Sequence, residues 1–329
     1  MSSIDASGAS SPLGDDGPAG VVTACIVGPT AAGKSALAMA LADANGLAIV
    51  SADSRQVYAG FDVGTAKPTQ DERNRVRHYG IDVADPRERY SAHRWATDAA
   101  MWCHEAAEGG TPPLIVGGTG LYIRAFAEPL DAVPTLDPNQ RAALEPVLAA
   151  LDRDALHRWC ARLDPARATL GRTQQLRAVE TALLTGTRLS AHLGGPRAAV
   201  RHVRYLVVDP GPVLAMRIAE RVHAMVANGF VEEIERLREV LPPDAPAWNA
   251  SGYGVMRAAV EGTMSMAAAI ERVIIETRQY AKRQRTWFRH QLPASAVTLV
   301  NPLDGDAVRQ AQQWWNTIGT APAASSQSG

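Results

Sequence analysis

The stretch Gly28-Pro29-Thr30-Ala31-Ala32-Gly33-Lys34-Ser35 decides the fold of this 329-residue chain. It follows an apolar, β-branched segment at 21–27 and opens into a helix-prone segment at 36–44. The pattern G-x-x-x-x-G-K-S between a strand and a helix is typical of a phosphate-binding loop, in which backbone N–H groups and a helix N-terminus surround an anion. Lys34 is expected to reach a terminal phosphate and Ser35 to hold Mg²⁺. The loop therefore predicts a protein that handles a diphosphate or a triphosphate.

Further segments predict a parallel α/β sheet around this loop. Strands and helices alternate through the first half of the chain, which is typical of a parallel sheet with helices on both faces. We expect strands at 21–27, 47–51, 114–116 and 203–208, and helices at 35–45, 88–108, 212–240 and 263–290. Ligands bind at the carboxyl ends of parallel strands, so the loops 28–35, 51–58 and 117–120 should converge on one site.

Domain organisation follows from changes in composition. Residues 139–190 are rich in Ala, Leu and Arg and show no strand pattern, which predicts an all-helical insertion. We predict a phosphate-binding-loop core at 20–135 and 200–312, a helical insertion at 136–199, a disordered tail at 1–19 and a C-terminal tail at 313–329 whose last ten residues are disordered.

Composition limits the class of protein. The net charge is −1, so any nucleic-acid surface must be a local patch. No apolar run approaches the about 18 residues of a membrane span and no signal peptide is evident, so we expect a cytoplasmic protein without membrane contact. The three cysteines are widely spaced with no C-x-x-C pair, which indicates a reducing compartment without a zinc site.

The lysines are few, and each is a candidate for a special role. Of 33 basic residues only Lys34, Lys67 and Lys282 are lysines. In a chain that otherwise uses Arg, a retained lysine indicates a need for a compact point charge. Lys34 is explained by the phosphate loop, which leaves Lys67 and Lys282 as candidates.

Two further features point to chemistry. Asp53 follows the second predicted strand beside the phosphate loop, although a lone Asp there is more often a turn or helix cap. A basic segment at 278–289 carries Trp287 and Phe288 and no acidic residue. A bare charge run is equally often a solvated helix face, but interleaved aromatic residues favour contact with a nucleic-acid backbone.

Several segments, in the same order, resemble the bacterial tRNA dimethylallyltransferases (tRNA isopentenyltransferases, the IPP transferase family). The resemblance covers roughly residues 21–290. The matching segments are the phosphate loop, 53–58 (DSRQVY), 64–68 (GTAKP), 82–91 (DVADPRERYS), 116–122 (VGGTGLY) and 277–284 (TRQYAKRQ).

The resemblance implies a prenyl transfer to tRNA. Such an enzyme moves a dimethylallyl group from dimethylallyl diphosphate to the exocyclic N6 amine of the adenosine on the 3′ side of the anticodon. Its substrates are tRNAs that read codons starting with U, and it releases pyrophosphate. The implied fold is a P-loop NTPase-like parallel sheet flanked by helices, with a helical insertion that grips the anticodon stem. The implied cofactor is Mg²⁺, and a monomer is expected.

Residue roles follow by the same resemblance. Asp53 would accept the proton of the amine, with Lys34 and Thr119 completing the catalytic group. The diphosphate would bind to Gly28, Pro29, Thr30, Ala31, Ala32, Gly33, Lys34 and Ser35, with Arg217 and Arg221. The tRNA would contact Asp53, Ser54, Arg55, Gln56, Thr119, Arg141, Thr173, Gln174, Arg177, Gly252, Tyr253, Arg278, Lys282, Arg283 and Arg285.

Two positions depart from the family pattern. Gly254 and Gln174 stand where the family usually has a basic residue. Each lost phosphate contact should weaken tRNA binding by roughly 1 kcal/mol and lower its salt dependence. Arg257 and Arg172 are candidates to compensate.

Two other functions remain open at this point. An adenylate isopentenyltransferase would use a free nucleotide as acceptor, but in general lacks the helical insertion and the basic C-terminal helix. A small-molecule kinase would use ATP in the same loop, with Arg217 and Arg221 as lid arginines, but leaves the 53–58 and 64–68 segments without a role.

Overall fold

The computed structural model describes residues 22–128, 133–134, 136–193 and 201–319. The described residues divide into two compact units, one from 22–127 and 201–319 and the other from the described part of 128–193. The predicted tail at 1–19 and the 320–329 part of the predicted C-terminal tail lie outside the described residues.

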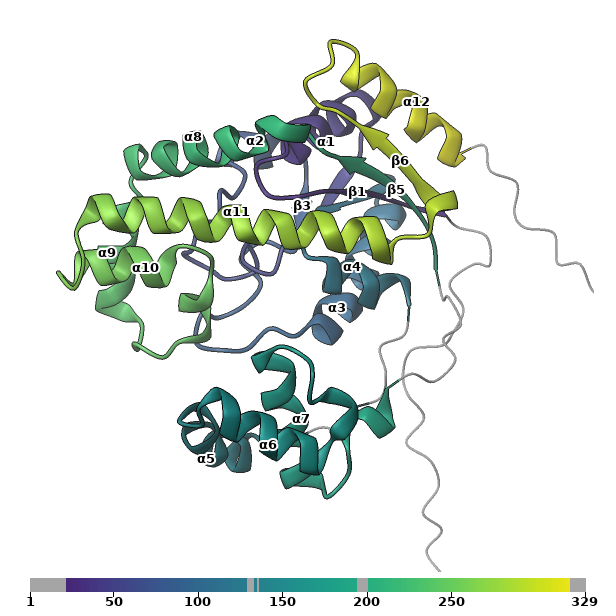
Figure 1. The fold of residues 1–329 in the computed structure, drawn as a ribbon. Helices are drawn as coiled ribbons and strands as arrows, with labels where there is room; N and C mark the ends of the chain where they lie inside the picture. The colour runs from purple at the N-terminus through teal and green to yellow at the C-terminus, as the bar shows by residue number, and fades with distance from the viewer. Residues whose placement is uncertain (1–21, 129–132, 135, 194–200, 320–329) are drawn as a thin grey trace, which may run out of the picture. The chain divides into compact units, whose positions relative to one another are not determined.

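The larger unit is built on a six-stranded parallel sheet in the order β3-β2-β4-β1-β5-β6, which confirms the predicted α/β fold. Figure 1 shows β1, β5 and β6 beside one another in this sheet. Cys25 on β1 pairs with Ile115 on one side and Tyr205 on the other. The strands are β1 (Val22–Val27), β2 (Ala48–Ala52), β3 (His78–Tyr79), β4 (Pro113–Gly117), β5 (His202–Val208) and β6 (Val297–Val300).

Helices cover both faces of this sheet. Alternate strand residues point to opposite faces, so Ile26 packs with α1 and α12 while Cys25 packs with α3 and α4. The helices of this unit are α1 (Lys34–Asn45), α2 (Gln70–Arg75), α3 (Ala92–Glu108), α4 (Gly120–Ala127), α8 (Leu214–Ala227), α9 (Phe230–Val240), α10 (Tyr253–Val260), α11 (Met266–Gln291) and α12 (Ala307–Gly319).

The predicted helix at 212–240 is wrong, because the chain forms two helices there. Gly229 separates α8 from α9 in a left-handed conformation, with φ of 96°, which glycine adopts readily. Met216 of α8 is exposed. The packed face is set instead by Leu214, Ile218 and Val222, which recur every four residues.

The C-terminal end also differs from the prediction. The long helix α11 is not the last element, because β6 and α12 follow it. A tail from residue 313 is wrong, since α12 runs to Gly319 and Trp314 is buried against the α1 face of the sheet. Both missed strands are short, since β6 has four residues and β3 has two, and neither gives a pattern long enough to predict a strand.

The smaller unit is helical in its described residues. It consists of α5 (Pro138–Ala149), α6 (Arg153–Leu163) and α7 (Arg172–Thr185), with two short 3-10 turns. Its core joins Leu156 and Cys160 of α6 to Val179 of α7. Across the part of the chain that the structure describes, no helix is both long and apolar enough to span a membrane.

Candidate active site

The phosphate loop joins β1 to α1 in a conformation that suits an anion. Ala31 and Gly33 both adopt left-handed backbone conformations, with φ of 61° and 97°. Successive N–H groups in such a turn point into one concavity, where the N-terminus of α1 adds a partial positive charge. A Cβ atom on Gly28 would lie 2.2 Å from the carbonyl oxygen of Val208, so only glycine fits there.

Three cations surround this loop. The Lys34 ammonium donates to the carbonyl oxygen of Pro29 at 2.8 Å, and Arg217 Nε donates to the carbonyl oxygen of Ala31 at 3.0 Å. Burial lowers the pKa of Lys34 to about 8; the charge of Arg221 lowers it as well, and Asp53 acts in the opposite direction. Burial also lowers the pKa of Arg221, against the attraction of Asp53. The Arg221 guanidinium has no hydrogen-bond partner among the described residues, so it is available to a ligand.

The second loop brings Asp53 to the same place. Asp53 Oδ1 accepts the backbone N–H of Arg55 at 2.9 Å, so it does cap a turn. Among the described residues, Oδ2 accepts no hydrogen bond and is left for a substrate. The Ser54 N–H donates to Thr119 Oγ1 at 3.0 Å, and the Thr119 N–H donates to the Ala52 carbonyl at 3.1 Å. The predicted convergence of the three loops is therefore confirmed.

A cavity of about 510 Å³ lies where these loops meet. Its polar wall includes Lys34, Ser35, Asp53, Arg55 and Arg221. Its apolar wall includes Ile218, Val222, Met225, Phe230 and Val273. A charged end beside an apolar wall suits a ligand with an anionic head and a hydrocarbon chain.

Gln56 lines this cavity, but its amide is largely used by the protein. Its Nε2 donates to the carbonyl oxygens of Thr65 and Ala66 at 3.3 and 3.1 Å. Its Oε1 accepts from the Ser51 hydroxyl at 2.9 Å. Only a further acceptor position on Oε1 remains for a substrate.

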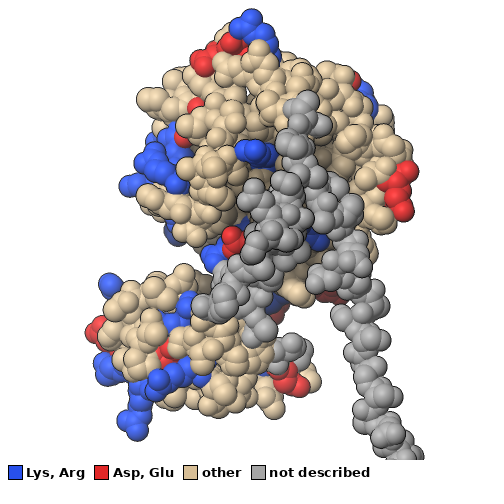
Figure 2. Space-filling model, turned by 90° about the vertical axis from the view of Figure 1, so that its right-hand side faces the viewer, with Lys and Arg blue, Asp and Glu red and all other residues tan. Residues whose placement is uncertain are grey.

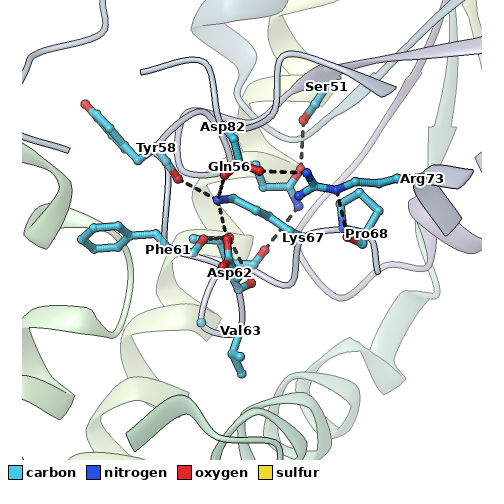
Figure 3. Close-up of polar contacts among 12 residues, drawn as sticks. Ser51, Gln56, Tyr58, Phe61, Asp62, Val63, Lys67, Pro68, Arg73 and Asp82 are labelled. Atoms are coloured by element: carbon cyan, nitrogen blue, oxygen red, sulfur yellow. Dashed lines mark hydrogen bonds and ion pairs between the residues drawn. The ribbon is translucent and has the colours of Figure 1, made fainter. Parts of the chain in front are cut away.

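Lys67 is a structural cation and not a substrate-binding one. Its side chain is 2% exposed, and its ammonium donates to the Tyr58 carbonyl and to Asp62 at 2.7 Å each, and to Asp82 (Figure 3). Figure 3 shows these three oxygens converging on the nitrogen, with Arg73 on the far side of Asp82. All three ammonium protons are thus used to hold the 58–67 loop that forms one wall of the cavity.

Replacing Lys67 by Met should destabilise the fold by about 1–3 kcal/mol at neutral pH, because it leaves two carboxylates without their shared partner. The cost stays in this range because Asp62 is half exposed to water. Burial acts to raise the pKa of Asp82, but hydrogen bonds from Lys67 and Arg73 outweigh it and hold the pKa below its usual range. The stability that this pairing of Asp82 contributes is present above the pKa of Asp in the unfolded chain, and it is lost as the pH falls through the lower pKa of Asp82 in the folded protein. Urea unfolding should show a smaller loss of unfolding free energy for Lys67→Met in acid than at pH 7. An equal loss at both pH values would contradict this role.

Glu233 of α9 holds the same loop from its other side, and sequence reasoning missed it. Its buried carboxylate accepts the backbone N–H groups of Asp62 and Val63 at 2.9 and 2.7 Å, together with the Tyr253 hydroxyl at 2.5 Å. Tyr253 is fully buried and Gly252 beside it is buried as well, so neither presents a surface to tRNA in this structure, and their tRNA contact stays a prediction. Glu233 is one of several glutamates in the amphipathic segment 230–240, and nothing in the sequence distinguishes it from the others.

The basic residues of α11 divide into two groups. Lys282 and Arg283 are exposed, as is Arg278, which also donates to the Ala215 carbonyl. Arg285 is instead half-buried and paired with Asp209, so part of its guanidinium is already used by the protein. Its tRNA contact stays a prediction. Figure 2 shows Lys and Arg in several small separate groups on the face it presents, with acidic residues among them.

In the smaller unit, most of the predicted tRNA-contacting side chains are open to solvent. Thr173, Gln174 and Arg177 are exposed on α7. Arg141 is held by Glu180 through two hydrogen bonds of 2.6 and 3.0 Å. The proposed compensating residues are partly engaged, since Arg172 donates to the Ala149 carbonyl and Arg257 pairs with Glu261.

The fold and the site define a class: an α/β protein with a phosphate-binding loop, an acid beside it, and an apolar wall for the rest of the ligand. The chain belongs to the IPP transferase family, whose model matches residues 56–291, and residues 22–83 match the isopentenyl transferase model.

Solved and curated relatives agree with this membership. A tRNA dimethylallyltransferase of Burkholderia ambifaria is 42% identical, covering 85% of this chain and 90% of the relative. The one from Gloeobacter violaceus is 42% identical over 88% and 94% of the two chains. The crystal structure of the full-length tRNA isopentenylpyrophosphate transferase of Bacillus halodurans matches with a TM-score of 0.65 at 32% identity, covering 90% of this chain and 96% of that one.

Proposed function

We propose that this enzyme transfers a dimethylallyl group from dimethylallyl diphosphate to the N6 amine of the adenosine 3′ to the anticodon, in tRNAs that read codons starting with U. The observation that carries the proposal is the open Oδ2 of Asp53 in one cavity with Lys34 and Arg221. A base and a pyrophosphate-binding group are the two functions that such a transfer requires. The names of the relatives support the substrate and the reaction.

The diphosphate end of the donor binds to the phosphate loop. As the allylic C–O bond breaks, negative charge grows on the departing pyrophosphate, and Lys34, Arg221 and the loop N–H groups stabilise it. The hydroxyl of Ser35 is exposed and has no protein partner among the described residues, so it fits a Mg²⁺ ligand. Bound Mg²⁺ would neutralise further charge on the diphosphate oxygens.

The acceptor amine loses a proton as its nitrogen bonds to the allylic carbon. Asp53 Oδ2 accepts this proton, and the N–H of Ser54 is kept in place by Thr119. The adenosine must leave its stack to enter the cavity. We propose that exposed basic residues of α11 and the α7 surface hold the surrounding stem and loop.

The enzyme is proposed to act in the cytoplasm, as a monomer. Its three cysteines, Cys25, Cys103 and Cys160, are all unpaired, which suits a reducing compartment.

The acceptor is tested by incubating the protein with radiolabelled dimethylallyl diphosphate, Mg²⁺ and either total tRNA or AMP. We expect label in tRNA and none in AMP. Label in AMP alone would replace the proposal with an adenylate isopentenyltransferase. Transfer from ATP at a normal kinase rate of about 1–100 s⁻¹ would favour a kinase instead.

Donor binding should weaken as pH rises through about 8, the pKa of Lys34 in the free enzyme. Lys34 is charged below this pKa and neutral above it, and because the pKa is lowered the change falls near pH 8. The diphosphate binds better to the charged form. The KM for dimethylallyl diphosphate should therefore rise on the alkaline side in the wild type. In Lys34→Arg the guanidinium stays charged, so this rise should disappear; identical profiles in the two proteins would contradict the assignment.

A further inference from the structure

The amide of Gln284 joins two of the loops that form the cavity. Gln284 lies in α11 and is buried, with 7% of it exposed. Its Oε1 accepts the backbone N–H of Thr30 in the phosphate loop at 2.8 Å. Its Nε2 donates to the carbonyl oxygen of Gly118, in the turn after β4, at 2.8 Å. One side chain thereby fixes the spacing between these two loops.

Each of these loops serves a different substrate in the proposed reaction. The phosphate loop carries Lys34 and holds the donor. The turn after β4 carries Thr119, whose hydroxyl accepts the N–H of Ser54, the residue next to the proposed base. Gln284 is therefore placed between the donor side and the acceptor side of the cavity.

The contact between Gln284 and the turn is tight. A Cβ atom on Gly118 would lie 2.4 Å from Gln284 Nε2 and 3.2 Å from the carbonyl oxygen of Gly28. The phosphate loop, the turn and the amide thus meet with no room for one more carbon atom. The amide therefore fills the space between the two loops, and its two hydrogen bonds fix how they lie against each other.

We propose that Gln284 is a positioning residue that sets the donor loop against the acceptor loop, so that the allylic carbon and the N6 amine meet at reacting distance. The inference rests on the proposed function. Each substrate keeps its own binding loop when the amide is lost, so affinity should change little. The reacting atoms would be misaligned, and misplacement by about 1 Å can cost roughly 100-fold in rate.

The first test is Gln284→Met, which keeps the length of the side chain and removes both hydrogen bonds. At saturating dimethylallyl diphosphate and tRNA, we expect the single-turnover rate to fall roughly 10- to 100-fold, with both KM values within a few-fold of the wild type. A purely structural role would lower the melting temperature without this separation of rate from KM.

Gln312→Met is the matched control. Gln312 of α12 exchanges two amide hydrogen bonds of 2.8 Å with Asn45 of α1, and neither residue lines the cavity. This variant should lose melting temperature to a similar extent as Gln284→Met but keep the wild-type rate.

Gly118→Ala provides a second route to the same displacement. The new methyl group would push the amide aside, and because that amide ends a flexible side chain, the fold should persist while its hydrogen bonds break. We expect the same loss of rate. Wild-type rates in both variants, or a loss confined to the KM of the donor, would overturn the inference alone. A wild-type protein that transfers no prenyl group would overturn the proposed function along with it.

Discussion

Asp53→Asn is expected to lower the rate of prenyl transfer by roughly 10²- to 10⁴-fold, the usual contribution of a general base. The amide keeps the shape of the side chain and its Oδ1 can still accept the Arg55 N–H, so the turn should survive. What it loses is the ability to take the proton of the amine. Single-turnover measurements at saturating substrates would give the rate without interference from product release.

Binding measurements make this prediction specific to catalysis. The affinity for tRNA should change little, and the affinity for dimethylallyl diphosphate should not fall, since the lost charge was negative and lies near Lys34 and Arg221. A loss of tRNA binding as severe as the loss of rate would contradict the role of Asp53 as the base.

Lys34→Met is expected to lower the rate by roughly 10²- to 10³-fold, as is typical when one preorganised donor to a developing anion is removed. The ammonium is held by the Pro29 carbonyl at the mouth of the phosphate loop. Its charge is the closest compact cation to the departing pyrophosphate in the proposed reaction. The KM for dimethylallyl diphosphate should rise as well, whereas the affinity for tRNA should not change.

Lys282→Met offers the contrasting pattern. Lys282 is exposed on α11 and does not line the cavity. Its loss should weaken tRNA binding and reduce by about one the slope of log Kd for tRNA against log salt concentration, with the KM for dimethylallyl diphosphate unchanged. If both lysine variants affected the two substrates alike, the separate assignment of donor and acceptor surfaces would be wrong.

Features that depend on contiguous residues could be predicted from the sequence. The phosphate loop could be predicted because its glycines, Lys34 and flanking elements are contiguous. Gly46 ends α1 in a left-handed conformation, as expected from its place after a helix-prone run. The proximity of Asp53 to the loop followed from strand order, because parallel strands end at one edge of the sheet.

Roles set by distant partners could not be predicted in the same way. Lys67 looked like a candidate for chemistry, but Asp62 and Asp82 surround it. Tyr253 looked like a tRNA contact, but Glu233 takes its hydroxyl in the core. These partners lie in other segments of the chain, and no local pattern records which of them meet in three dimensions.

The helical surfaces show the same limit. A charge run such as 278–289 predicts a basic helix, but the packing of α11 decides which side chains remain exposed. Arg285 faces Asp209 and is half-buried, whereas Lys282 and Arg283 reach solvent. The family resemblance supplied the order of the segments, and the structure shows which of their side chains are accessible.

Prenyl transfer to the N6 amine of the adenosine 3′ to the anticodon is tested by locating the transferred group within tRNA. Unmodified tRNA that reads codons starting with U would be incubated with the enzyme, Mg²⁺ and labelled dimethylallyl diphosphate. One portion of the product would be cut with a base-specific nuclease to locate the label in the sequence, and another would be digested to nucleosides to identify the labelled nucleoside. We expect one labelled N6-dimethylallyl adenosine, on the 3′ side of the anticodon, with the wild type, and almost none with Asp53→Asn. Label at another nucleoside, or equal labelling by the two proteins, would contradict it.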